Sequence, residues 1–151
     1  MAVTVLLTDI VDALEIQFDE MPEFLDLDSD QVITISLDLL RDAEESTEEE
    51  ESEDDEEFKL AKGIVVSGRY LRLPSKYEVH EWQIMRDFAD SVQSSRIRAD
   101  LDHALHGRGA FRHFKSELIR HRIEPSWFGF RAEALRKIAI EWLEDNQISW
   151  T

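Results

Sequence analysis

The five histidines are the residues best suited to catalysis or metal binding, and all of them lie in the second half of the sequence: His80, His103, His106, His113 and His121. His103 and His106, three positions apart, can share one face of a helix as metal ligands. The H-E-x-x-H pattern of a zinc protease is absent, and no further ligand follows at an informative spacing. We therefore predict no metal site and expect the histidines on the surface or at helix ends.

The run DLDSD at residues 26–30 begins like a calcium-binding loop. Such a loop needs glycine at its sixth position and a bidentate glutamate at its twelfth. Gln31 and Leu37 occupy these positions, so both requirements fail. We interpret the run as a hairpin turn that carries aspartates on its exposed side.

Nucleophilic chemistry finds no support in the sequence. There is no cysteine, which excludes disulfides, thiolate zinc sites and iron–sulfur clusters. There is also no G-x-S-x-G, no S-x-x-K and no glycine-rich phosphate loop among the five glycines. We predict no cofactor. The enzyme hypothesis that stays open is a hydrolase that uses His106 or His113 with a nearby carboxylate.

Residues 106–122 (HGRGAFRHFKSELIRHR) form the one basic stretch, with a net charge of +4 besides three histidines. Phe111 and Phe114 are three positions apart, which is typical of a helix and not of an RNA-binding strand. The charges can still contact an acidic protein or a nucleic acid. The candidate binding residues in and after this stretch are Arg108, Arg112, His113, Lys115, Arg120, Trp127 and Arg131.

Residues 41–57 (RDAEESTEEEESEDDEE) hold most of the negative charge of the chain. They carry twelve acidic residues and one arginine, a net charge of −11 within a total of −17. Such runs repel themselves and stay solvated, so we expect a flexible acidic loop. We also hypothesise that residues 42–57 transiently cover the basic stretch and compete with an anionic partner.

The elements that must position these residues are predicted from apolar spacing. Apolar residues recur every three or four positions over 5–18, which predicts a helix. They alternate with polar residues on both sides of a Ser29-Asp30 turn, which predicts a β-hairpin. Residues 63–74 (GIVVSGRYLRLP) are expected to add a strand or a pair of strands.

Four helices are predicted in the second half. They cover 77–92, a short stretch capped by Ser94 or Ser95 and ended near Gly107, then 109–121 and 131–146, with Pro125 as an interruption. The fold class is therefore α+β in a single domain, 1–151, with a helical half at about 77–146. We expect one core to hold Trp82, Phe111, Phe114 and Trp142.

Location and partners follow from what the sequence lacks. No apolar run approaches the ~20 residues of a membrane span, and no signal-peptide pattern begins at Met1. We expect a cytoplasmic protein that does not bind membranes, and the oligomeric state stays open.

Several stretches resemble a bacterial uncharacterised protein family, number 158 of the UPF series. They are RYLRLPSKYEVHEWQIMRDFADSV, LDHALHGRGAFRHFKSEL and WFGFRAEALRKIAIEWLED, and the resemblance covers nearly the whole chain. It implies a small bacterial cytoplasmic protein. The family brings no established activity, so the resemblance assigns no site residue.

The function that these observations favour is a non-enzymatic binding or adaptor module. Its helical half would present the Arg108–Arg122 stretch to an acidic partner. The alternatives are the small hydrolase and a nucleic-acid-binding regulator. A pocket lined by Arg108, His113 and Trp127 would favour the hydrolase, and a flat basic face would favour the module.

Overall fold

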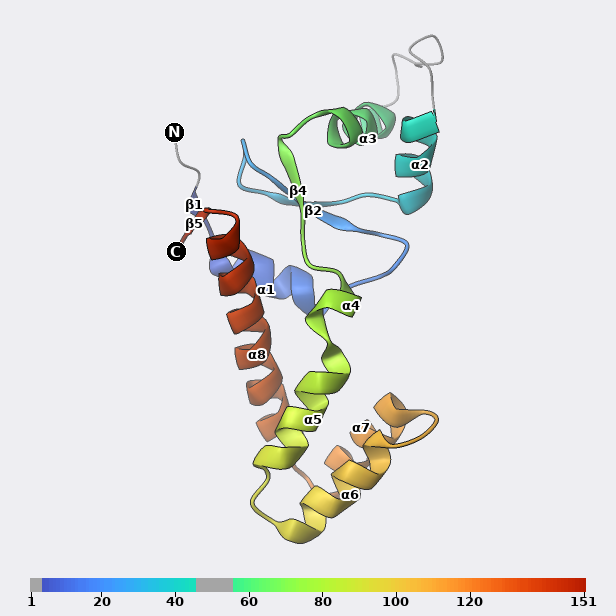
Figure 1. The fold of residues 1–151 in the computed structure, drawn as a ribbon, viewed down its shortest axis with the longest axis vertical. Coiled ribbons are helices and arrows are strands. Elements are labelled where there is room, and N and C mark those ends of the chain that lie inside the picture. The colour runs from blue at the N-terminus through green and yellow to red at the C-terminus, as the bar shows by residue number, and fades with distance from the viewer. Residues whose placement is uncertain (1–3, 46–55) are drawn as a thin grey trace. The chain divides into compact units, whose positions relative to one another are not determined.

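The computed structural model describes residues 4–45 and 56–151 and has an α+β fold (Figure 1). The chain forms two compact units, one of residues 1–76 with 139–151 and one of residues 77–138. In the described parts of the chain, no helix combines the length and apolar character needed to cross a membrane.

The first unit contains a three-stranded antiparallel sheet. Its strands are β2 (Glu23–Asp26), β3 (Val32–Thr34) and β4 (Tyr70–Arg72), in the order β3-β2-β4. Phe24 in the central strand lies opposite Ile33 on one side and Arg72 on the other. The predicted hairpin and its third strand are therefore confirmed.

Two helices pack against each other beside this sheet, α2 (Leu37–Glu45) and α3 (Glu56–Val66). Both correct the sequence prediction. The hairpin ends at Thr34 because Ser36 caps α2, its hydroxyl accepting a hydrogen bond from the backbone N–H of Leu39. The strand expected from residue 63 onward is helical as far as Val66, and strand structure starts only at Tyr70.

The apolar sides of α2 and α3 explain why these segments are helical. Buried side chains from the sheet and from both helices form one cluster: Phe24, Ile35, Leu40, Ala43 and Ala61. The expected acidic loop at 41–57 is thus shorter than predicted, since residues 41–45 complete α2 and residues 56–57 begin α3. Its central residues, 46–55, lie outside the described residues, and the covering hypothesis stays a prediction.

The two ends of the described chain meet in the first unit. Strand β1 (Thr4–Val5) pairs in parallel with β5 (Ser149–Trp150), next to the predicted helix α1 (Leu7–Glu15). The N–H of Leu7 donates to the carbonyl of Thr151 at 3.0 Å, and the N–H of Thr151 donates to the carbonyl of Val5 at 2.9 Å. No apolar alternation in the sequence predicts this pair, because each strand has only two residues.

The second unit is helical, as predicted. Its helices are α4 (Lys76–Val79), α5 (Glu81–Ser91), α6 (Ser95–Leu105), α7 (Ala110–Arg120) and most of α8 (Glu124–Asp145). Ser94 caps α6 as expected, accepting a hydrogen bond from the N–H of Ile97.

Two helix boundaries in this unit differ from the prediction. The helix expected over 77–92 is divided at His80, whose φ of 56° is left-handed. Pro125 does not interrupt a helix, because it is the second residue of α8. In the first turn of a helix the missing N–H of proline costs nothing, so α8 begins seven residues earlier than predicted.

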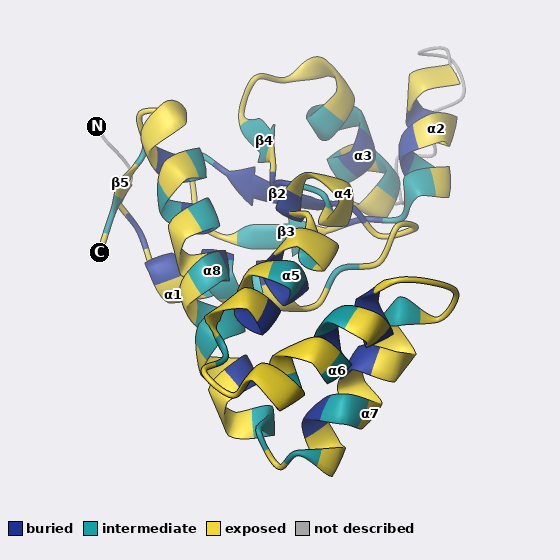
Figure 2. Cartoon of the chain, turned by 60° about the horizontal axis from the view of Figure 1, so that its bottom comes forward, coloured by how far each residue is buried: buried dark blue, intermediate teal, exposed yellow. Residues whose placement is uncertain are grey.

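The core of the second unit is aromatic. Phe114 is fully buried, and its ring meets Trp127 edge-to-face at 5.0 Å and Phe88 at 6.3 Å between centroids. Figure 2 shows the buried positions as stripes along the helices, with exposed residues on the opposite sides. The expectation of one shared aromatic core is wrong for Trp82 and Phe111, which are 40% and 51% exposed, and for Trp142, which is half-buried and belongs to the first unit.

Candidate functional site

The turn between α6 and α7 presents Arg108 to solvent. Gly107 and Gly109 lie on either side of it. Their φ values of 126° and 69° are backbone angles that residues with a Cβ rarely adopt. Gly109 is also the N-cap of α7. The two glycines therefore allow the tight connection that leaves Arg108 exposed directly before the helix.

Helix α7 is amphipathic, but its exposed side is not purely polar. Phe114 and Leu118 are buried in the core of the unit. Phe111, Lys115 and Ile119 follow one another at four-residue intervals along an exposed side. Phe111 and Ile119 are 51% and 60% exposed, although both are large and apolar.

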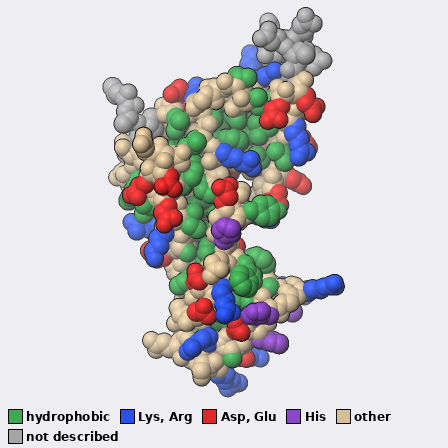
Figure 3. Space-filling model, in the orientation of Figure 1, with side chains coloured by type: hydrophobic (Ala, Val, Ile, Leu, Met, Phe, Trp, Pro, Cys, Tyr) green, Lys and Arg blue, Asp and Glu red, His purple; other side chains and the backbone are tan. Residues whose placement is uncertain are grey.

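We call the exposed residues Phe111, Arg112, Lys115 and Ile119 the α7 outer face. Within the described ranges, the side chains of Arg112, Lys115 and the neighbouring Arg108 make no ion pair. His113, on the same helix, is also exposed. Figure 3 shows Lys, Arg and His side chains on the surface of the helical unit, with acidic side chains among them. The α7 outer face thus combines unneutralised positive charge with apolar surface.

Two predicted binding residues lie elsewhere. Trp127 is only 4% exposed and contacts Phe88 and Phe114 in the aromatic core, so it contributes packing and not a binding surface. Arg131 pairs with Glu81, its Nε lying 2.6 Å from Oε1, which joins α8 to α5. Arg112 and Lys115 therefore share the α7 outer face, with Arg108 in the turn that precedes the helix, whereas His113 lies on another side of α7 and Trp127 and Arg131 serve packing and an ion pair.

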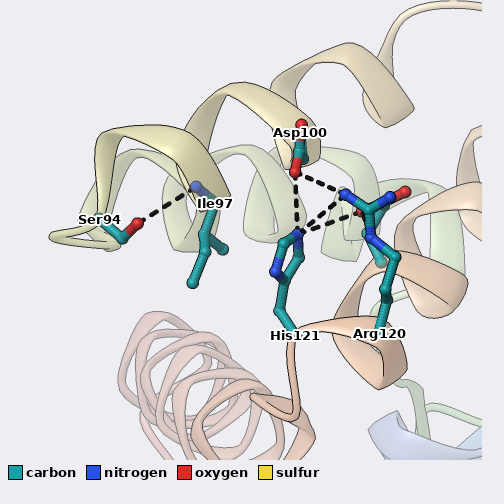
Figure 4. Close-up of polar contacts among 6 residues, drawn as sticks. Ser94, Ile97, Asp100, Arg120 and His121 are labelled. Carbon is teal, nitrogen blue, oxygen red and sulfur yellow. Dashed lines mark hydrogen bonds and ion pairs between the residues drawn. The ribbon is translucent and has the colours of Figure 1, made fainter.

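The last predicted residue, Arg120, belongs to an ion-pair cluster at the end of α7. Arg120 and His121 both point toward Asp100 on α6 (Figure 4). Arg120 Nη2 lies 2.7 Å and His121 Nε2 lies 3.0 Å from Asp100 Oδ2. The carboxylate of Glu117, one turn earlier on α7, lies 3.2 Å from Arg120 Nε and 3.3 Å from His121 Nε2.

The electrostatics of this cluster favour the ionised aspartate. Partial burial raises the pKa of Asp100, but the hydrogen bond from His121 and the charge of Arg120 outweigh burial and lower it overall.

An open hollow of about 490 Å³ adjoins the cluster and is lined by Ser94, Arg96, Ile97, Arg120 and His121. A pocket lined by Arg108, His113 and Trp127 would have favoured the hydrolase, and none of these three residues lines this hollow.

The two histidines of the hydrolase hypothesis have no catalytic arrangement among the described residues. The Nδ1 of His106 lies 2.7 Å from the backbone carbonyl of Asp102 and 3.9 Å from its carboxylate, on a side chain that is 62% exposed. His113 has no carboxylate within ion-pairing distance in the described ranges. The arrangement gives a general base no buried partner to orient it.

Sequence reasoning missed Asp100 and Glu117. Glu117 and His121 are separated by four positions in a predicted helix, a spacing that places them on one face and could have been noticed. Nothing in the sequence pointed to Asp100, because its approach depends on how α6 packs against α7.

Comparison with known proteins addresses the identity of the chain. The model of the uncharacterised protein family UPF0158 matches residues 2–151. The chain belongs to this family. The resemblance found in the sequence is therefore confirmed, and UPF0158 membership covers both compact units.

One relative of this UPF0158 chain is the UPF0158 protein PA5073 of Pseudomonas aeruginosa. The two are 36% identical over 66 residues, which is 43% of this chain and 43% of the relative. The match thus spans less than half the length of that protein. No solved structure matches the chain.

Proposed function

We propose that this protein is a binding module whose α7 outer face docks an acidic segment of a partner protein. The observation that carries the proposal concerns one helix. Arg112 and Lys115, which form no ion pair with any residue that the structure describes, lie beside the exposed Phe111 and Ile119. We also propose the cytoplasm as the compartment in which this partner is met.

The composition of the α7 outer face favours an acidic protein segment over other anionic partners. An acidic segment with apolar side chains would neutralise Arg112 and Lys115 and cover Phe111 and Ile119 at once. Each large apolar side chain removed from water contributes up to about 1.5–3 kcal/mol. Exposed charge pairs add about 0–1 kcal/mol each and mainly speed association.

A nucleic acid would use the face differently. Phosphates would engage the cations alone, and the affinity would fall steeply with salt because binding releases counterions. Phe111 could stack one base, but Ile119 offers no aromatic surface for a second. We therefore treat nucleic-acid binding as the competing outcome of the test.

The test is fluorescence anisotropy with a labelled helical peptide that carries glutamates on one side and leucines on the other. We expect binding that weakens at least about tenfold for R112E/K115E and for F111A/I119A, because each pair of substitutions removes one of the two contributions. A second peptide, with glutamine in place of each glutamate, serves as the matching control. The parent protein should bind it no more tightly than R112E/K115E binds the glutamate peptide.

The matched control is R136E/K137E, which makes the same charge change at two exposed positions of α8 in the same unit. This variant should bind the peptide like the parent protein, apart from a small long-range effect. Equal weakening by both charge variants would show that net charge, and not the α7 outer face, determines binding. Tight, salt-sensitive binding of a single-stranded oligonucleotide without peptide binding would overturn the proposal in favour of a nucleic-acid regulator.

A further inference from the structure

Three side chains, one from α6, one from α7 and one from the residue that follows α7, bring together donor atoms of the kinds that divalent metals bind. The Nε2 of His121 lies 3.0 Å from Asp100 Oδ2 and 3.3 Å from Glu117 Oε2. All three ligand atoms lie within 4.8 Å of one another, and helices α6 and α7 pack together. The set contains an imidazole and is therefore more than a group of acids.

The spacing agrees with tetrahedral coordination. Zinc bonds of ~2.0–2.1 Å to nitrogen and oxygen place neighbouring tetrahedral ligands ~3.3 Å apart. The two measured separations, 3.0 and 3.3 Å, are close to this value. A cation between the three atoms would thus need only a small adjustment of the side chains.

An independent observation at Glu117 also points to a ligand. Its Oε2 atom is buried and accepts no hydrogen bond within the described parts of the chain, although Arg120 and His121 are near it. Among the described residues, only the ion-pair contact with Arg120 at 3.2 Å and the proximity of His121 at 3.3 Å offset the burial of this oxygen. The oxygen is also one of the three atoms that converge, so a bound cation would give it a direct ligand bond in place of these contacts.

The geometry points to a binding site for a divalent transition metal such as Zn²⁺, formed by Asp100, Glu117 and His121. Imidazole and carboxylate together suit zinc, whereas calcium and magnesium take oxygen ligands. The hollow beside His121 leaves space for a fourth ligand from solvent or from a partner molecule. This site is separate from the α7 outer face and revises the prediction that the chain binds no metal.

Arg120 competes with the metal for the same oxygens. Its guanidinium contacts both carboxylates, and its side chain is 57% exposed, so it can turn into solvent when a cation binds. Removing this positive charge should therefore strengthen metal binding. A cluster that serves only as an ion-pair network predicts no such gain.

The experiment is isothermal titration of untagged, chelator-treated protein with Zn²⁺, supported by NMR of the histidine side chains. We expect one site per chain, shifts at His121, at least tenfold weaker binding for D100N and E117Q, and several-fold tighter binding for R120M. Circular dichroism without metal should show that all variants are folded.

H103Q/H106Q is the matched control, because these exposed histidines in and directly after α6 are other candidates for adventitious zinc binding. It should leave the affinity unchanged. Loss of the site in H103Q/H106Q, or equal affinity in folded D100N, E117Q and parent protein, would overturn the proposal. Should D100N fail to fold, unchanged affinity in R120M together with unshifted His121 resonances would overturn it equally.

Discussion

The guanidinium of Arg69 donates two hydrogen bonds to the carboxylate of Asp26, and each is 2.7 Å long. Asp26 ends the central strand β2 and is only 6% exposed, while Arg69 directly precedes β4. The same carboxylate accepts the hydroxyl of Ser29 and the N–H of Asp28. An aspartate expected on the exposed side of a turn is therefore a buried link between two strands.

This link should matter for stability. We expect Asp26→Asn to lower the free energy of unfolding by about 1–3 kcal/mol at pH 7, because the bidentate, charge-assisted pairing is lost. Urea denaturation measures the change. Asp28→Asn is the control, since Asp28 lies 3.3 Å from Arg69 but is largely exposed, and it should cost less than about 0.5 kcal/mol.

The pH dependence of the same pair has a definite sign. Hydrogen bonds from Arg69 hold the pKa of Asp26 well below its usual range, although burial opposes this. The stability it contributes is therefore fully present above the unfolded pKa of about 3.9, and it is lost as the pH falls toward the lower folded pKa. The gap between parent and Asp26→Asn should shrink only below about pH 4. A gap that closes already between pH 7 and 5 would contradict this assignment.

Two phenylalanines on α7 provide a matched test of the second unit. Phe114 is fully buried and Phe111 is half exposed, three positions away on the same helix. Phe114→Ala should cost about 3–5 kcal/mol in denaturant unfolding, because it leaves a cavity among Phe88 and Trp127. Phe111→Ala should cost less than about 1 kcal/mol. Similar costs at both positions would show that the α7 outer face is part of the core.

Where the sequence analysis succeeded, local periodicity decided the structure. Helices α1, α6 and α7 each bury one regular face, so apolar spacing predicts them. The β2–β3 hairpin is also where the alternation predicts it, although all four residues of β2 are buried and not only those of one face. The prediction failed where one sequence pattern was compatible with two structures. The β-branched residues near Val66 favour a strand in isolation, yet α3 is helical because it packs on α2. Pro125 reads as a helix break, yet it stands in the first turn of α8.

The parts that could not be predicted depend on contacts between distant segments. Strands β1 and β5 have two residues each and pair Thr4 with Ser149, so neither carries a periodic signal of its own. The exposed basic residues of α7 were predictable from charge and helical spacing. The meeting of Asp100 with His121 was not, because it exists only after α6 and α7 pack.

Glu23, at the start of the central strand β2, is a buried acid with little to stabilise its charge. It is 9% exposed, and its Oε1 atom has no hydrogen-bond partner among the described residues. Burial raises the pKa of Glu23 to about 7, although a hydrogen bond from Gln17 opposes the shift. The folded protein therefore holds a proton on Glu23 at pH values where the unfolded chain has released it.

Because of this proton, the contribution of Glu23 to the free energy of unfolding changes with pH in the opposite direction to the contribution of Asp26. Because the folded state binds more protons than the unfolded state between about pH 4.5 and 7, the free energy of unfolding should fall as the pH rises through this window. Glu23→Gln keeps the shape and stays neutral, so its own contribution should not vary with pH. We expect the variant to be more stable than the parent by about 1–3 kcal/mol at pH 8, with the difference vanishing near pH 4.5.

Urea unfolding of parent and variant at matched pH values measures this difference, and the subtraction removes the titration of the histidines. Glu20→Gln, at an exposed position three residues earlier, is the control and should give a profile parallel to that of the parent. In the folded state the carboxylate of Glu23 would have to carry its charge away from water, whereas the side chain of Glu20 is exposed. Parallel profiles for Glu23→Gln and the parent would mean that Glu23 ionises in the folded protein as readily as in the unfolded chain. In that case water or a rearranged Gln17 reaches the carboxylate, and the buried position at the start of β2 is more open than its 9% exposure indicates.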